Sequence, residues 1–222
     1  MNKIQAVILD MDGILIDSER HWQLCERALF ARLGIDLTDE LLVQTRGLRT
    51  EEMLAHWWAR FPMDGNDPGK LMADYDRRMV ETMRKEVQLM EGARELIGMF
   101  REMKLPLALA TCSTREHIDA VMEKHGLGDA FDHLVSAAVD MAGKPHPEVF
   151  LRTAKLLGVD PTACLVFEDS FYGVIAAKAA RMKVVAMPDS REYEQERFGA
   201  ADLKIRSLTE FNMESFKKLQ EN

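Results

Sequence analysis

The sequence has few cysteines and no long apolar segment, and each shortage excludes a class of protein. Three of the 222 residues are cysteines, Cys25, Cys112 and Cys164, and their wide spacing matches no metal-binding pattern. Scattered reduced thiols are typical of cytoplasmic proteins, and we expect this location. No apolar run approaches the roughly 20 residues that cross a bilayer, and residues 1–9 lack the basic start and long apolar stretch of a signal peptide. We therefore expect no association with membranes.

Basic residues are fewer than acidic residues. The chain has 29 Lys and Arg against 37 Asp and Glu, which gives a net charge of −8. An acidic surface disfavours nucleic acids and anionic membranes as partners, and any phosphate site must be positive locally. The hydrophobic share of 47% is enough for a core of about 150 residues with a smaller insertion. We expect a monomer, and the sequence leaves a dimer open.

Short apolar runs alternate with segments of helical periodicity. The strand-like runs are Ile4–Leu9, Leu105–Ala110, Leu134–Ser136, Cys164–Phe167, Val184–Met187 and, more weakly, Leu203–Ile205. The helical segments are Ala93–Met103, Arg115–His125, Pro147–Leu157 and Tyr172–Ala180. This alternation predicts an α/β fold, a Rossmann-like doubly wound parallel sheet with helices on both faces. Ligands of such sheets bind beyond the carboxyl ends of the strands.

One segment interrupts the alternation. Residues 17–90 contain no convincing strand and show helical periodicity, with Ser18 placed to cap a first helix and Thr50 to open another. We expect an inserted α-helical cap domain over 17–90 and a core domain formed by 1–16 and 91–222. The alternative is a helical layer packed permanently on the sheet.

Two carboxylates stand at the end of the first apolar run, in Asp10-Met11-Asp12-Gly13. At a strand end the second acid can fold over the first, and Gly13 allows the sharp turn that this requires. Two neighbouring acids are costly to bury unless they share a cation or divide acid and base roles. Taken alone, the pattern favours a polar strand end followed by a turn.

Three further polar motifs follow later apolar runs. They are Thr111, Gly143-Lys144-Pro145 and Glu168-Asp169-Ser170. Each alone has a structural explanation: a strand end, a surface lysine and a helix N-cap. Together with Asp10-Met11-Asp12-Gly13 they resemble, in order and spacing, the four motifs of the haloacid dehalogenase-like (HAD) hydrolase superfamily. The resemblance extends over nearly the whole chain, and the insertion looks like the helical cap of one branch.

The resemblance implies phosphoryl transfer through an aspartyl-phosphate. It assigns Asp10 as the nucleophile and Asp12 as the general acid and base, which protonates the leaving alkoxide and then deprotonates the attacking water. Thr111 would donate its hydroxyl to a phosphoryl oxygen, with backbone N–H groups near Cys112 assisting. Lys144 would pair with both Asp10 and the phosphate.

The resemblance also implies a metal ion. A carboxylate that faces a phosphate dianion needs a bridging cation, and hard oxygen ligands favour Mg²⁺. The side chain of Asp10, the backbone carbonyl of Asp12 and Asp169 are assigned to this ion. Glu168 stands nearby, either as a direct ligand or as an acceptor behind the ligands.

Asp12 and the helical insertion narrow the range of expected substrates. Dehalogenases and phosphonate hydrolases of the superfamily lack an aspartate at the position of Asp12, so its presence points to phosphate monoesters. The insertion looks most like that of bacterial hexose- and hexitol-phosphate phosphatases, including 2-deoxyglucose-6-phosphate phosphatases. We therefore expect a sugar phosphate as the small-molecule partner. Trp22 and Arg49, and with weaker support Arg46 and His21, are candidate substrate contacts.

Two alternatives remain. A sugar phosphomutase similar to β-phosphoglucomutase carries a histidine near the start of the first cap helix. This chain has Trp22 at that point and His21 one residue earlier, and an indole cannot perform the proton chemistry of histidine. A more remote alternative is a catalytically silent binding protein of the same fold, against which the presence of every motif residue argues.

The metal assignment makes the first testable prediction. Chelation with EDTA should abolish the release of phosphate from monoesters, because the Asp10 carboxylate would then repel the substrate dianion, and added Mg²⁺ should restore it. Steady-state phosphate release measures both effects. Full activity after thorough chelation would contradict the assignment.

Overall fold

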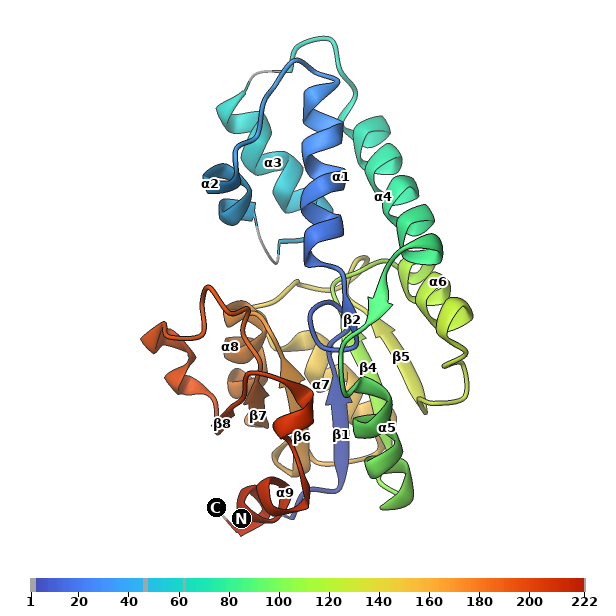
Figure 1. Cartoon of the computed structure of the whole chain (residues 1–222), viewed down its shortest axis with the longest axis vertical. Coiled ribbons are helices and arrows are strands. Elements are labelled where there is room, and N and C mark those ends of the chain that lie inside the picture. The colour runs from blue at the N-terminus through green and yellow to red at the C-terminus, as the bar shows by residue number, and fades with distance from the viewer. Residues whose placement is uncertain (1–2, 46–47, 62, 222) are drawn as a thin grey trace.

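Six parallel strands form the centre of the molecule. The computed structural model describes residues 3–45, 48–61 and 63–221. The sheet has the order β5 (His133–Ser136), β4 (Leu107–Thr111), β1 (Ala6–Leu9), β6 (Cys164–Glu168), β7 (Lys183–Ala186) and β8 (Leu203–Lys204), as Figure 1 shows. Every neighbouring pair is parallel. The predicted doubly wound sheet is therefore confirmed.

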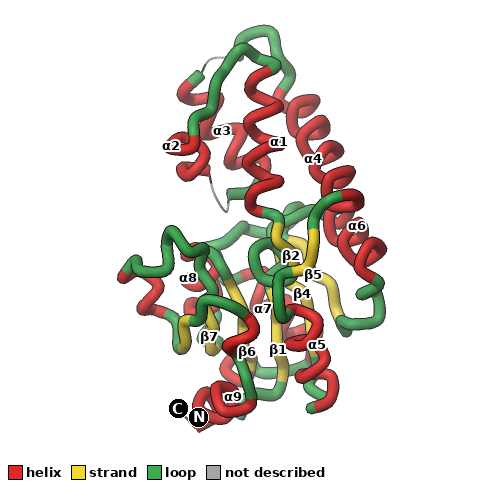
Figure 2. The backbone as a smooth tube through the Cα atoms, viewed as in Figure 1, coloured by secondary structure: helices red, strands yellow, loops and turns green. Residues whose placement is uncertain are grey.

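Helices cover both faces of the sheet. Side chains of a strand alternate between the two faces, so each strand contributes residues to both cores. Val7 and Leu9 of β1 belong to one core cluster, and Ala6 and Ile8 belong to the other. The first cluster includes residues of α5 (Ala93–Glu102), α6 (Arg115–His125) and α9 (Met213–Glu221). The second includes residues of α7 (Glu148–Leu157) and α8 (Phe171–Ala179), and Figure 2 shows these layers. Strands buried on both faces explain the continuous apolar runs of the sequence.

The remaining helices lie together at the carboxyl end of the strands (Figure 1). They are α1 (Glu19–Ala31), α2 (Asp39–Leu42), α3 (Thr50–Arg60) and α4 (Pro68–Lys85). Short 3₁₀ turns occur at Val43–Thr45, Pro161–Ala163, Glu196–Ala200 and Leu208–Glu210. Trp57 is fully buried among these helices and packs edge-on against Phe30, with 6.3 Å between ring centroids. We refer to residues 17–90 as the helical insertion; its status as a separate domain stays a prediction.

The expectation that the insertion contains no strand is wrong. β2 (Ile16–Asp17) and β3 (Gln88–Leu89) pair antiparallel where the chain enters and leaves the helical insertion. Strands of two residues have no periodicity that a sequence could reveal. They tie the two ends of the insertion together directly beyond β1. In the described part of the chain, no helix is both long and apolar enough to cross a bilayer.

An aromatic cluster joins the sheet to α5 and α9. Phe100 lies 5.9 Å from Phe167 and 5.9 Å from Phe216, measured between ring centroids, and 6.1 Å from Phe211. Phe167 and Phe211 meet edge to face at 4.9 Å. Such pairs add to the free energy of burial because the edge of one ring is attracted to the face of the other.

Truncation of Phe100 tests the importance of this cluster. Phe100→Ala should lower the free energy of unfolding by about 3–5 kcal/mol, because it leaves a cavity between three rings. Leu151→Ala, on the exposed side of α7, is the control and should change it by less than about 0.5 kcal/mol. Urea unfolding followed by circular dichroism measures both, and equal effects would contradict the prediction.

Candidate active site

The polar motifs meet at one edge of the sheet. Leu9, the last residue of β1, lies opposite Leu109 of β4 and Phe167 of β6. Asp10 therefore emerges level with the carboxyl ends of both neighbouring strands. In the sheet, β4 and β5 lie on one side of β1, and β6, β7 and β8 lie on the other. The strand order therefore reverses beside β1, and ligands of such folds bind at that switch point.

A buried ammonium group joins two of the carboxylates. Lys144 Nζ donates to Asp10 Oδ1 at 2.6 Å and to Glu168 Oε1 at 2.5 Å, and it lies 3.4 Å from the carbonyl oxygen of Ala110. All three charged side chains are less than a tenth exposed. The other oxygen of Glu168 accepts from the backbone N–H and the hydroxyl of Ser170 at 3.1 and 3.0 Å. Both oxygens of Glu168 are thus engaged by protein groups.

Burial and crowding set the charge state of this pair. Burial raises the pKa of Asp10 to about 8, opposed by the Lys144 ammonium and assisted by repulsion from Glu168 and Asp12. Burial alone would lower the pKa of Lys144, but the carboxylates of Asp10 and Glu168 outweigh it and raise that pKa well above its usual range. Lys144 is therefore charged at neutral pH, and the carboxylates around it repel one another.

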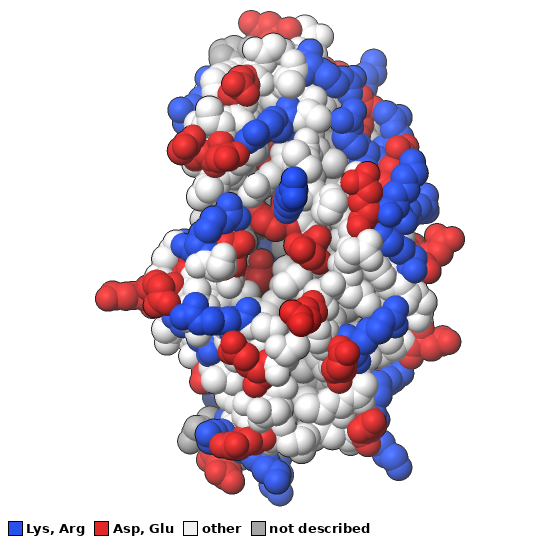
Figure 3. All heavy atoms as spheres, viewed as in Figure 1, with Lys and Arg blue, Asp and Glu red and all other residues white. Residues whose placement is uncertain are grey.

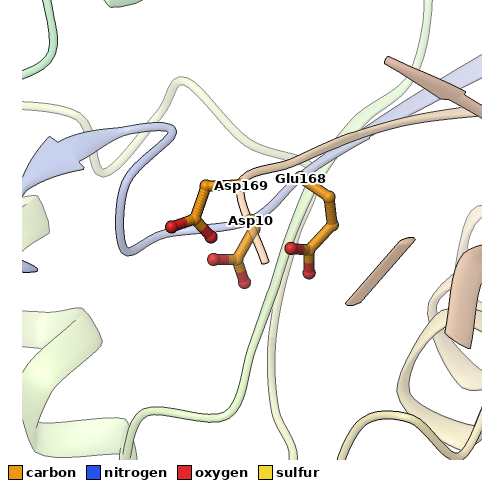
Figure 4. Close-up of side chains that lie close together, drawn as sticks. All are labelled: Asp10, Glu168 and Asp169. Atoms are coloured by element: carbon orange, nitrogen blue, oxygen red, sulfur yellow. The ribbon is translucent and has the colours of Figure 1, made fainter. Parts of the chain in front are cut away.

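A second set of oxygens could hold a cation. One carboxylate oxygen from each of Asp10, Glu168 and Asp169 lies within 4.8 Å of the others, and Figure 4 shows the three side chains converging. Gly13 adopts φ +75°, and a Cβ there would lie 2.4 Å from Asp169 Oδ2. Oxygen-only donors suit a hard divalent ion such as Mg²⁺, so the residues present fit the predicted metal.

Glycine is also required where α8 begins. A Cβ on Gly173 would lie 1.9 Å from the carboxylate of Glu168, so only glycine leaves this carboxylate its place. The N–H of Gly173 bonds to the hydroxyl of Ser170, which caps the helix and donates to Glu168. One turn of chain therefore orients both Glu168 and the start of α8.

Three donors hold the carboxylate of Asp12. Ser18 Oγ donates to Oδ1 at 2.6 Å, and Trp22 Nε1 donates to the same oxygen at 2.7 Å. Ser113 Oγ donates to Oδ2 at 2.7 Å. The expectation that Ser18 caps α1 is wrong: its hydroxyl makes no cap hydrogen bond and is used by Asp12 instead. Residues from the helical insertion and from the sheet thus meet on one carboxylate.

The loop after β4 completes the polar floor of the site. Thr111 is 1% exposed, and its hydroxyl accepts from the N–H of Ser113 at 3.0 Å. Ser136 donates to the carbonyl of Ser113 at 2.6 Å and so fixes the loop. Burial raises the pKa of the Cys112 thiol although Lys144 opposes it, so Cys112 is not a thiolate nucleophile.

These groups line a cavity of about 330 Å³ between the sheet and the helical insertion. Its lining includes Asp10, Asp12, Thr111, Lys144 and Asp169 from the sheet side. Figure 3 shows the surface hollowed at this level, with acidic side chains in the hollow. The volume is in the range of a small-molecule site.

The candidate substrate contacts lie in different places. Trp22 and Arg49 line the cavity. Arg49 donates to Glu52 Oε1 within the insertion at 2.9 Å. It also donates to the carbonyl of Met141, outside the insertion, at 3.2 Å and so joins the two parts of the chain. His21 lies 3.9 Å from Glu86 and is not among the residues that line the cavity. Arg46 lies outside the described residues.

Two residues in contact with the site carried no signal in the sequence. Ser113 was indistinguishable from any loop serine, although it follows the Thr111 motif by two residues. Glu26 lies on α1, where the sequence analysis assigned it no role, yet it is buried and lines the cavity. Only its spacing of four residues from Trp22 could have suggested this position.

Comparison with known proteins identifies the relatives of this chain. The family model of haloacid dehalogenase-like hydrolases matches residues 7–187. Hexitol phosphatase B of Escherichia coli strain K12 is 38% identical over 209 residues, which are 94% of each chain. A protein of Drosophila melanogaster named as a probable pseudouridine-5'-phosphatase is 34% identical, over 97% of this chain and 95% of the relative.

Solved structures agree in fold. CbbY from Rhodobacter sphaeroides, crystallised with phosphate, superposes with a TM-score of 0.87 over 96% of this chain and 99% of that chain, at 23% identity. β-Phosphoglucomutase from Clostridium difficile superposes with a TM-score of 0.84 over 98% of this chain and 97% of that chain, at 22% identity. At these identities the likeness concerns the fold alone.

The crowded carboxylates predict opposite effects of two substitutions on the metal-free protein. Because the pKa of folded Asp10, about 8, exceeds its ordinary value of 3.8, ionising this carboxyl costs stability as the pH rises through that interval. Asp10→Asn removes this cost. In EDTA, the Asp10→Asn variant should be at least as stable as the wild type, with a free energy of unfolding up to about 1–2 kcal/mol higher. This difference should grow from pH 5 to pH 8.

Lys144→Met is the matched opposite. It removes the ammonium between Asp10 and Glu168 and should cost about 3–5 kcal/mol at pH 8, and less at pH 5, where carboxylates take up protons. Urea unfolding in EDTA at the two pH values measures both variants. A destabilised Asp10→Asn beside a neutral Lys144→Met would contradict this view of the site.

Proposed function

The chain belongs to the family of haloacid dehalogenase-like hydrolases and is an enzyme, and from this premise we propose that it is a Mg²⁺-dependent phosphatase of sugar phosphates. The reaction releases phosphate from a hexose or hexitol phosphate through an aspartyl-phosphate on Asp10. The observation that carries the proposal is the cavity in which the buried Asp10–Lys144 pair faces the Asp12 carboxylate.

The first step forms a bond between a carboxylate oxygen of Asp10 and phosphorus. Lys144 binds Oδ1 of Asp10 and so orients the carboxylate for attack through its other oxygen. The bond between phosphorus and the sugar oxygen breaks as the new bond forms, and protonated Asp12 gives its proton to the departing alkoxide. The sugar leaves as a neutral alcohol.

The second step returns the enzyme to its starting state. Asp12, now ionised, takes a proton from a water molecule as the water oxygen attacks phosphorus. The bond between phosphorus and Asp10 breaks, and inorganic phosphate is released. Ser18, Trp22 and Ser113 donate hydrogen bonds to the carboxylate of Asp12 and so orient it toward the cavity for its proposed role.

Charge neutralisation is shared by protein groups and the metal. The carboxylates of Asp10 and Asp169, with the backbone carbonyl of Asp12, would hold Mg²⁺, and this ion would supply positive charge to offset the repulsion between these carboxylates and the phosphate. Glu168 is placed behind these ligands, because its oxygens already accept from Lys144 and Ser170. Thr111 donates to a phosphoryl oxygen, and Lys144 balances the charge on the same side.

Sugar phosphates are proposed as substrates on two grounds. The similarity to a hexitol phosphatase covers 94% of both chains at 38% identity. The cavity also has a polar wall on the insertion side, with Thr45, Thr50 and Asp76 among its lining residues. Hydroxyl groups of a sugar would find hydrogen-bond partners there. The cap domain over 17–90 would close over the sugar and exclude bulk water.

Hydrolysis is favoured over mutase chemistry by the start of α1. Trp22 is at the position expected for the mutase histidine, and its indole N–H donates a hydrogen bond to Asp12. An indole cannot act as the acid or base that this histidine provides. His21 lies beside Glu86, away from the cavity lining. The opposing alternative of a silent binding protein is disfavoured because Asp10, Asp12 and Lys144 are all in contact with the cavity.

A single assay tests the proposal. Incubation with glucose 1-phosphate and Mg²⁺, followed by ³¹P NMR, should show inorganic phosphate as the main product. Accumulation of glucose 6-phosphate would identify a mutase instead. Asp12→Asn should slow phosphate release by about 10²–10⁴-fold, because it removes general acid and base catalysis. Glu81→Gln, on the exposed side of α4, is the control and should match the wild type.

A further inference from the structure

The wall of the cavity opposite the metal ligands contains a buried carboxylate that the mechanism does not use. Glu26 lies on α1, is 5% exposed and lines the cavity. Its Oε1 accepts two hydrogen bonds, from Thr45 Oγ1 at 2.8 Å and from Trp57 Nε1 at 2.5 Å. A carboxylate with two fixed donors on one oxygen has a defined orientation.

The second oxygen of Glu26 remains available to a ligand. None of the hydrogen bonds formed within residues 3–45, 48–61 and 63–221 uses Oε2. Trp57, which binds Oε1, is fully buried and does not line the cavity. Burial raises the pKa of Glu26, while the hydrogen bonds from Trp57 and Thr45 oppose this shift and favour the ionised form. Because Glu26 lines the cavity, a hydroxyl group of a ligand could donate a hydrogen bond to this oxygen.

The spacing along α1 places Glu26 relative to the reaction. Trp22 and Glu26 are four residues apart and lie on the same face of the helix. The indole of Trp22 binds Asp12, the proposed donor of the proton to the leaving oxygen. Glu26 therefore lies about 6 Å from Trp22 along the axis of α1, the rise of four helical residues, and both side chains line the cavity. A polyol chain of several carbons spans that distance, and a very small leaving group does not.

Other acidic side chains line the same cavity as Glu26. The lining also includes Glu19, Glu51, Asp76 and Glu192, and Thr50 Oγ1 donates to Asp76 at 3.0 Å. Two lining arginines already pair with carboxylates, Arg49 with Glu52 at 2.9 Å and Arg197 with Glu192 at 2.5 Å. The carboxylate of Glu26 would accept a hydrogen bond from a hydroxyl group and would repel a second anionic group on the leaving alcohol.

We propose that Glu26 is a specificity-determining residue, which accepts a hydrogen bond from a hydroxyl of the leaving alcohol and selects neutral polyol chains over chains that carry a second anion. This inference rests on the proposed phosphatase function and refines its substrate class. The preferred substrates are uncharged beyond the reacting phosphate. Sugar bisphosphates and phosphorylated sugar acids are disfavoured.

Three probes and Glu26→Gln test the proposal. Glucitol 6-phosphate and 6-phosphogluconate share a six-carbon chain and differ at the far end, which is an alcohol in one and a carboxylate in the other. Acetyl phosphate has no chain that reaches Glu26. The wild type should prefer glucitol 6-phosphate. Gln keeps an acceptor for Thr45 and Trp57 but presents an amide donor without charge to the cavity.

We expect Glu26→Gln to lower kcat/KM for glucitol 6-phosphate by about 10- to 100-fold, the loss of a hydrogen bond to a charged group. The preference for glucitol 6-phosphate over 6-phosphogluconate should fall at least about tenfold, because repulsion of the carboxylate is relieved. Acetyl phosphate should lose no more than about threefold. Glu81→Gln, the same chemical change on the exposed side of α4, should leave all three rates as in the wild type.

Thr45→Val provides an independent test, because it keeps Glu26 and removes one of the two donors that orient it. It should reproduce the pattern with a smaller loss. An unchanged preference in Glu26→Gln, or equal losses on all three probes, would overturn the assignment, since Glu26 would then serve only the packing of the insertion. A wild type that hydrolyses none of the probes would instead refute the proposed function.

Discussion

One buried ammonium group underlies the arrangement of the whole site. Lys144 pairs with Asp10 and Glu168, which emerge from adjacent strands, and their repulsion is tolerable only with a cation between them. Parallel strands bring these carboxylates to one edge, and Gly173 leaves room for one of them. The result is a site that concentrates negative charge and is suited to a divalent ion.

Asp12 connects this centre to the helical insertion. Its carboxylate accepts from Ser18 and Trp22, at the start of α1, and from Ser113, in the loop after β4. The proposed acid and base is therefore held jointly by the sheet and by the segment that would contact the sugar. Any movement of α1 relative to the sheet would change the donors around Asp12. In the proposed mechanism, this one side chain would couple substrate binding to proton transfer.

The cavity divides chemistry from selectivity. The sheet side carries the proposed nucleophile, the ammonium and the proposed metal ligands, while the insertion side carries Glu26, held by Thr45 and the buried Trp57. A carboxylate is a poor neighbour for phosphate and a good acceptor for hydroxyl groups. In the proposed mode of binding, the phosphate end of a sugar phosphate would lie beside Lys144 and the metal ion, and its hydroxyl groups would lie beside Glu26. This difference would orient the substrate without a large apolar contact.

The sequence by itself determined the parallel sheet and the four motifs at its edge, because buried strands and the residues that end them leave strong local patterns. It missed β2 and β3, since two-residue strands have no periodicity, and it assigned Ser18 to a cap that the structure does not contain. Ser113 and Glu26 acquired their positions only in the tertiary structure. Their partners lie 101 residues from Ser113 and 31 and 19 residues from Glu26, and no local pattern records contacts between such distant segments.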